Sequence, residues 1–163
     1  MKSVLPSSLA LAALLAACGS APAVDDGGVL PDPAELACAH LPDATAALTA
    51  SAAPDASAPL LTVGPVPHLL TMPATGTGYV RVQTDLADET LIFFLREGAA
   101  LTAVLDEAGA PLPLVSAGPN TFCAADLPEH FDVTFGAVGT YYIELTSAAD
   151  VWLLASESGG HLP

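Results

Sequence analysis

Short apolar segments recur along residues 46–154, and Gly, Pro, Asp and Asn separate them. They follow one another at intervals of about 8–12 residues, a spacing typical of β-sandwiches and β-barrels. No segment after the N-terminal 18 residues has a convincing helical period. The pattern predicts an all-β fold, an antiparallel β-sandwich of jelly-roll or Ig-like type with about eight or nine strands.

Two of these segments have especially clear strand patterns. Val80 and Val82 alternate with Arg81, which places the valines on one face of a strand and the arginine on the other. Residues 91–95 are apolar throughout, as expected for a strand that is buried on both faces. The other candidate strands are residues 46–52 (strand or helix), 60–63, 68–72, 101–105, 112–115, 131–135, 140–145 and 151–154.

A turn separates two of the candidate strands. Residues 101–105 and 112–115 flank Asp106-Glu107-Ala108-Gly109-Ala110, in which Gly109 is available for the left-handed conformation of a tight turn. The two segments are therefore predicted to pair as a hairpin.

The N-terminus has the organisation of an export signal. Lys2 is the only charged residue before Cys18, and a mainly apolar run extends from Val4 to Ala17. This run has the length of a signal-peptide core and is shorter than the roughly 20 residues of a membrane-spanning helix. The stretch Leu15-Ala16-Ala17-Cys18-Gly19 resembles the lipobox of bacterial lipoproteins.

The lipobox resemblance implies that the thiol of Cys18 is acylated. In that family the chain is cleaved before the cysteine and the new amine is also acylated, and several acyl chains give stable anchoring. The alternative is an ordinary signal peptide with Cys18 in a disulfide. Gly19 stands where an Asp would resemble an inner-membrane retention signal. We therefore expect a lipid-anchored protein of the bacterial cell envelope, in the outer membrane and facing the periplasm or the cell surface.

Cleavage before Cys18 would leave 146 of the 163 residues, the size of a single domain with a tether. We expect three parts. Residues 1–17 form the signal peptide, and residues 18–37, rich in Pro, Gly and Asp, form a flexible acidic tether. Residues 38–163 form the β-sandwich domain.

The mature chain is strongly acidic. All 18 Asp and Glu residues follow Cys18, whereas Arg81 and Arg96 are the only basic residues left of three, which gives a charge of −16 with neutral histidines. This charge repels phosphate backbones and anionic headgroups, so nucleic acid is a poor partner. It keeps a chain with 52% hydrophobic residues soluble and would also attract cations.

Two cysteines remain when Cys18 carries lipid. Cys38 and Cys123 are predicted to form a disulfide in an oxidising compartment, closing a loop of about 85 residues and contributing about 4 kcal/mol to stability. The alternative is a pair of thiolate metal ligands.

The last predicted hairpin carries a second resemblance. Gly139-Thr140-Tyr141-Tyr142-Ile143-Glu144-Leu145, preceded by residues 131–135, resembles the last hairpin of pre-peptidase C-terminal-type β-sandwich domains. Asp106 to Gly109 resembles their Asp-x-x-Gly hairpin. The resemblance covers residues 76–157 and implies a secreted binding or accessory module.

Three histidines suggest a metal site. His40, His68 and His161, with Glu157 as a further ligand, are residue types that bind zinc or copper. Their scattered spacing fits no metal motif, so the site depends on how the chain folds. The alternative is that these histidines share no partner. His130, beside Asp132, is interpreted as a surface residue.

No motif indicates an enzyme. The chain lacks a Gly-x-Ser-x-Gly elbow, a phosphate-binding loop, His-Glu-x-x-His and Cys-x-x-Cys. Trp152, the sole tryptophan, is interpreted as a core or edge residue instead of a carbohydrate platform. We therefore expect a non-enzymatic binding or structural module of the cell envelope, or alternatively a zinc- or copper-binding lipoprotein.

Overall fold

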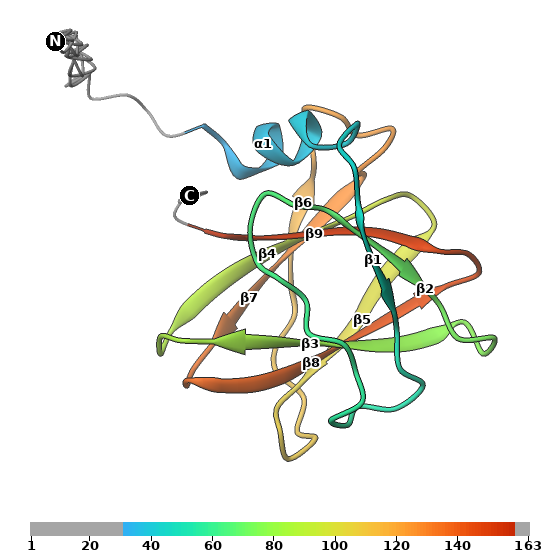
Figure 1. The fold of residues 1–163 in the computed structure, drawn as a ribbon. Helices are drawn as coiled ribbons and strands as arrows, with labels where there is room; N and C mark the ends of the chain where they lie inside the picture. The colour runs from blue at the N-terminus through green and yellow to red at the C-terminus, as the bar shows by residue number, and fades with distance from the viewer. Residues whose placement is uncertain (1–30, 159–163) are drawn as a thin grey trace, which may run out of the picture.

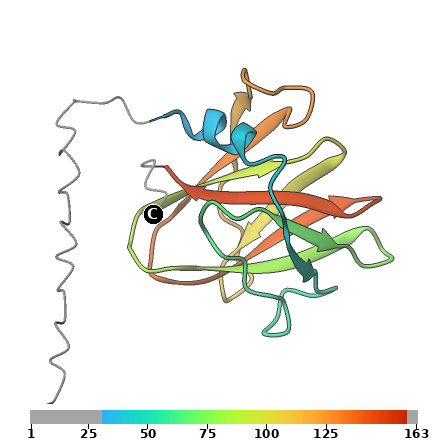
Figure 2. The ribbon, with the colours of Figure 1, turned by 45° about the horizontal axis from the view of Figure 1, so that its top comes forward.

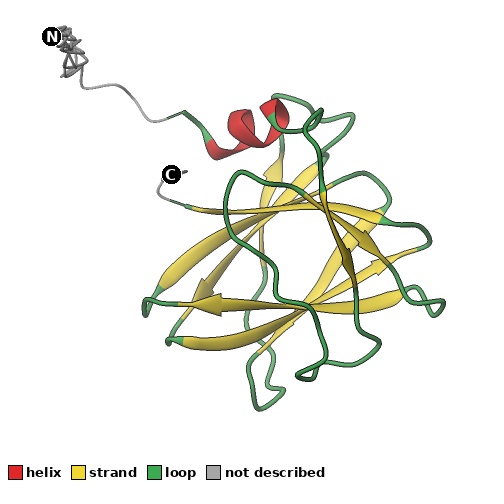
Figure 3. Ribbon diagram, in the orientation of Figure 1, coloured by secondary structure: helices red, strands yellow, loops and turns green. Residues whose placement is uncertain are grey.

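The computed structural model describes residues 31–158 and has one helix and two β-sheets in this range (Figures 1 and 3). The larger sheet has the strand order β1-β2-β9-β4-β7-β6 and the smaller one has the order β3-β8-β5. The prediction of an all-β chain is confirmed. The elements are α1 (Pro33–Ala39), β1 (Ala46–Thr49), β2 (His68–Thr71), β3 (Thr77–Thr84), β4 (Glu89–Leu95), β5 (Ala99–Leu105), β6 (Val115–Pro119), β7 (Glu129–Phe135), β8 (Gly139–Ser147) and β9 (Val151–Glu157).

Several predictions concern residues outside this range. The signal peptide, Cys18, most of the tether and His161 lie outside the described residues. Between residues 31 and 158, no helix has the length and apolar character needed to cross a membrane.

Alternating side chains of the two sheets form one hydrophobic core. Val80 and Val82 of β3 are fully buried, as their alternation with Arg81 predicted. They belong to the same cluster as Ile143 of β8, and Phe93 and other residues of the larger sheet complete it. The smaller sheet therefore covers one face of the larger sheet.

Strand β4 is buried on both faces, as predicted for residues 91–95. Phe93 points into the core between the sheets, whereas Ile92 and Phe94 point to the opposite side. There they pack with Ala37 of α1 and Leu127 of the β6–β7 connection. Figure 2 shows α1 on the side of β4 and β9 that lies away from β3 and β8. The helix and this connection thus supply the second cover that an apolar strand requires.

Helix α1 begins before Cys38, the residue at which the domain was predicted to start. Residues 33–37 were expected in the tether and no helix was expected there, but α1 begins at Pro33. Asp32 caps it by accepting a hydrogen bond from the backbone N–H of Ala34, and proline is favourable in the first turn. The helix has only seven residues, too few for a detectable period, and the burial of Ala34 and Ala37 against the larger sheet stabilises it.

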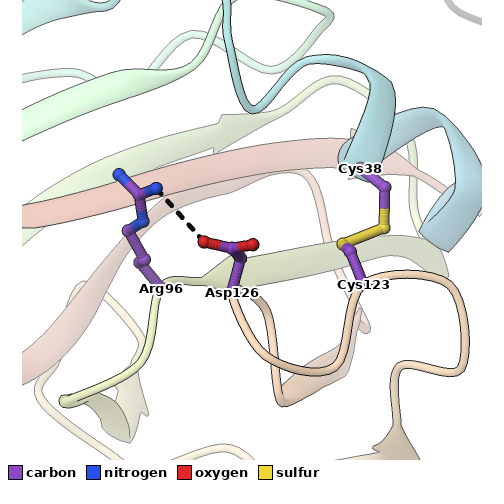
Figure 4. Close-up of polar contacts among 4 residues, drawn as sticks. All are labelled: Cys38, Arg96, Cys123 and Asp126. Carbon is purple, nitrogen blue, oxygen red and sulfur yellow. Dashed lines mark hydrogen bonds and ion pairs between the residues drawn. A yellow bond between two sulfur atoms is a disulfide. The ribbon is translucent and has the colours of Figure 1, made fainter.

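The Cys38–Cys123 disulfide is confirmed and joins α1 to the β6–β7 connection (Figure 4). The buried Asn120 organises this connection, because its side-chain oxygen accepts hydrogen bonds from the backbone N–H groups of Phe122 and Cys123. Close by, Arg96 forms an ion pair with Asp126 at 3.3 Å. The bridge therefore fastens together the two segments that cover β4 from outside.

The predicted hairpin forms only at its turn. Asp106 accepts a backbone hydrogen bond from Gly109, which has a φ of +82°, and Leu112 donates one to Val104. Beyond that contact, however, residues 112–115 do not pair with β5, and β6 pairs with β7 in the other sheet. Pro111 and Pro113 have no N–H to donate, so a continuous ladder with β5 cannot form here.

Two further segments differ from the prediction. Residues 60–63 are not a strand; they cross between the sheets, and Leu61 donates a hydrogen bond to Arg81 while Gly64 donates one to Ala155. Strands β1 and β2 are parallel, although every other strand pair is antiparallel as predicted. The long crossing segment between β1 and β2 allows this parallel pairing.

Replacing both bridging cysteines, as in Cys38→Ser with Cys123→Ser, should lower the free energy of unfolding by about 4 kcal/mol. The reason is that the unfolded chain regains the freedom of a long closed loop. Denaturant unfolding monitored by Trp152 fluorescence would measure the loss. Reductant should shift the wild-type midpoint in the same direction and leave the double variant unchanged; an unshifted wild-type midpoint would contradict the prediction.

Candidate functional site

A cleft lies where three connections meet at one end of the sheets. Its volume is about 930 Å³. Figure 1 shows the β2–β3, β4–β5 and β8–β9 connections gathered at the right of the molecule. Small and hydroxylated side chains dominate its walls, which include Thr75, Thr77, Thr146 and Ser147, and Asp150 is the only charged residue in its lining.

The cleft continues onto the outer face of the smaller sheet, which is the face turned away from the core. Thr77 and Thr146 are direct neighbours across β3 and β8, and the next pair on the same face is Tyr79 and Glu144. Ala100 of β5 lies opposite Thr146 and completes the row at the edge of the cleft. The cleft wall and the sheet face therefore form one continuous surface.

A carboxylate with two hydroxyl donors lies on this face. Tyr79 donates a hydrogen bond to Oε2 of Glu144 at 2.5 Å, and Thr102 donates one to Oε1 at 2.7 Å. The three side chains come from the three strands of the sheet. Thr102 reaches Glu144 because the pairing of β5 with β8 shifts between Leu101 and Ala103, and such a β-bulge redirects a side chain. We call these three residues the carboxylate cluster.

The two hydrogen bonds define the charge of the carboxylate cluster. The hydroxyls of Thr102 and Tyr79 stabilise the ionised carboxylate and lower the pKa of Glu144 below its usual value. The same interaction raises the pKa of the Tyr79 phenol, because losing its proton would end the hydrogen bond to Glu144. At neutral pH the cluster is thus a fixed carboxylate held by two protonated hydroxyls.

The two arginine side chains of the described residues form their polar contacts outside the cleft. Arg81 lies one pair further along the outer face, and its Nε donates a hydrogen bond to the carbonyl of Ala58 at 2.6 Å. Arg96 pairs with Asp126. The cleft lining itself contains neither arginine, so an anionic ligand would meet no positive side chain there.

Gly78 allows the β2–β3 connection to pack closely on β3. A Cβ atom at this position would lie 2.7 Å from the Cβ of Ala50 and 2.9 Å from Cδ of Pro73. Pro73 and Met72 line the cleft. The glycine therefore determines how near this wall of the cleft lies to the sheet.

The predicted metal ligands are not brought together within the described residues. His40 ends α1 and its Nδ1 lies 2.7 Å from Oδ2 of Asp43, on the outer side of the larger sheet. His68 is buried on the core side, and its Nε2–H donates to the carbonyl of Thr62 at 3.2 Å. No group of three or more His, Cys, Asp or Glu residues in the part from 31 to 158 is placed to hold a metal ion. The three-histidine site includes His161, outside this part, and stays a prediction.

Two other residues were interpreted from the sequence. Trp152 is almost fully buried beside α1, so its placement in the core is confirmed. His130 is half-buried and stacks on Phe94 with ring centroids 5.3 Å apart, so its interpretation as a surface residue is wrong. The strand alternation was correct, but the outer side of β7 is partly covered.

Sequence reasoning missed the carboxylate cluster, although part of the signal was present. Alternation assigns Val80 and Val82 to the core and leaves Tyr79 on the opposite face, and the same rule leaves Glu144 outside on β8. Nothing in the sequence indicates that β3 and β8 are neighbours. The bulge that presents Thr102 also has no glycine or other recognisable marker.

No protein-family model matches this chain, and no curated protein is significantly similar to it in sequence.

The buried His68 should make stability depend on pH. Burial lowers its pKa below the ordinary value of 6.5, so the unfolded chain binds a proton at a higher pH than the folded one. This histidine therefore destabilises the fold as the pH decreases through about 6.5, and it has no such effect well above that pH. Denaturant unfolding at about pH 7.5 and about pH 5.5 would measure the difference.

Two variants isolate this effect. His68→Gln should reduce the loss of stability between these two pH values, because glutamine retains an N–H donor but does not titrate there. His40→Gln removes a different histidine and should keep the part of the loss that comes from His68. An undiminished loss in His68→Gln would refute the assignment to His68.

Gly78→Ala should destabilise the protein by about 1–3 kcal/mol, because the added methyl group overlaps Ala50 and Pro73. Thermal or denaturant unfolding would measure the change. Gly136→Ala is the matched control, since a Cβ atom there would have no neighbour within 4 Å. Equal stabilities of the two variants would contradict the close packing at Gly78.

Proposed function

We propose that this protein is a lipid-anchored, non-enzymatic binding module of the bacterial cell envelope. Its folded part would be a β-sandwich of jelly-roll or Ig-like type, presented outside the cytoplasm by a tether that starts at the acylated Cys18. The membrane is then its first partner, reached through the lipid.

The observation that carries the binding role is the cleft with the adjoining carboxylate cluster. Its side chains come from connections and strands that a shared core holds in place, so the surface is preorganised for a ligand. Glu144 has a lowered pKa and both of its oxygens accept hydroxyl protons. A general acid needs a raised pKa instead, so this carboxylate is better suited to binding than to acid catalysis.

The disulfide supports the extracytoplasmic location. Cys38 and Cys123 are bonded with Cα atoms 5.9 Å apart, and such structural bridges are typical of oxidising compartments. Because the acidic chain is repelled by anionic headgroups, attachment to the membrane would have to come from the lipid.

Cys18→Ala should abolish acylation and move the protein from the membrane fraction to the soluble fraction of a bacterial host that processes lipoproteins. The thiol is the required lipid acceptor, so no other residue can replace it. Radiolabelled palmitate incorporation and membrane fractionation would measure both effects. Ser20→Ala is the control and should behave as wild type. Unchanged labelling and fractionation of Cys18→Ala would overturn the proposed anchor.

A further inference from the structure

We propose that the cleft and the outer face of the smaller sheet bind a neutral polysaccharide chain. This inference rests on the proposed role as a binding module and names the class of ligand for that site. It follows from the hydrogen-bonding character, the charge and the shape of the surface.

The surface is rich in hydrogen-bond acceptors. The hydroxyl protons of Tyr79 and Thr102 are both donated to Glu144. The two hydroxyl oxygens can therefore only accept further hydrogen bonds. The ionised Glu144 also accepts only, as does the carboxylate of Asp150 in the cleft. A matching ligand must therefore supply many donors, and the hydroxyl groups of sugars do so without carrying charge.

The hydroxyls of the cleft add flexible partners. Thr77 and Thr146 belong to the cleft lining, and each of their hydroxyls can rotate to donate or to accept. The Ser147 hydroxyl, also in the lining, accepts a hydrogen bond from the backbone N–H of Ala149 and keeps its own proton to donate. A sugar hydroxyl has the same dual character, so these groups can complete hydrogen bonds in either direction.

The charge of the protein favours a neutral ligand over an anionic polymer or a basic peptide. An anionic polymer would be repelled by the mature chain and would find no arginine in the cleft lining. A basic peptide would be attracted to acidic residues everywhere on the surface. The carboxylate of Glu144 would give such a peptide little specificity, since it is only one of 18 acidic residues. The cleft lining has four hydroxyl side chains and one charged residue, so it is suited to hydrogen bonds more than to ion pairs.

The shape fits a chain better than a small enclosed molecule. The cleft is open and runs onto the sheet, where paired residues on neighbouring strands repeat about every 4.8 Å. Alanine and glycine residues, including Ala99 and Ala100, line part of the cleft, so no long side chain of theirs blocks a polymer there. A repeating ligand would use the cleft and the carboxylate cluster at the same time.

Affinity electrophoresis of the full-length lipidated protein in detergent would test the proposal. The probes are dextran, laminarin, mannan and xylan as neutral polysaccharides, polygalacturonate as the anionic one and polylysine as the basic polypeptide. At least one neutral polysaccharide should bind at both low and high salt, since neutral ligands are not screened. Tyr79→Phe combined with Thr102→Val should weaken that binding about tenfold or more, because it removes two oxygen acceptors and releases Glu144.

Matched variants keep the test independent of folding. Thr134→Val removes one partner of the Thr90–Thr134 hydroxyl pair, 2.8 Å apart on the larger sheet, and should bind as wild type. Ala100→Arg places a long side chain at an exposed position of the cleft lining and should weaken binding even if the double variant unfolds.

Three results would overturn the proposal: no neutral polysaccharide binds, only polylysine binds and is released by salt, or binding survives in both the double variant and Ala100→Arg. Failure here leaves palmitate labelling of Cys18 intact, so it is distinguishable from failure of the anchor. Binding of polylysine alone would retain a binding role with a different ligand class.

Discussion

The burial of β4 on both of its faces is the constraint on which the remaining structure depends. Phe93 and Phe94 point in opposite directions and both are fully buried, so the strand needs a cover on each side. The smaller sheet covers one side. On the other side, α1 and the β6–β7 connection form a small second core, and the Cys38–Cys123 bridge joins these two short segments. A seven-residue helix would be too short to hold this position without such packing and linkage.

This arrangement decides which surface is left for function. Both faces of the larger sheet contribute to hydrophobic clusters, whereas the smaller sheet contributes its inner face to the main cluster and has Tyr142 buried on its outer face. The rest of this outer face carries Tyr79, Thr102 and Glu144, whose side chains are joined by hydrogen bonds. The connections at one end add the cleft, so the proposed binding groups lie on the side of the three strands opposite their main core contacts.

The differences between prediction and structure have local causes. Alternation located β3, β7 and β8 because one face of each meets the core, but it missed α1, whose short length hides any helical period. The turn at Asp106–Gly109 was predicted correctly from the sequence. The strand pairing after the turn was predicted wrongly, because Pro111 and Pro113 interrupt the ladder and β6 joins the other sheet. His130 alternates correctly and yet is partly covered, because Phe94 on the neighbouring strand stacks against it.

The sequence by itself determined the all-β class, the faces of the strongest strands and the pairing of Cys38 with Cys123, because these depend on periodicity and on the small number of cysteines. Tertiary structure alone decided which strands are neighbours, and with that the meeting of Tyr79 and Glu144 from positions 65 residues apart. It also decided that His40 and His68 have separate partners. The physical reason is that strand order and bulges depend on packing between residues far apart in the sequence. Such packing produces no periodic pattern in the sequence around the residues that meet.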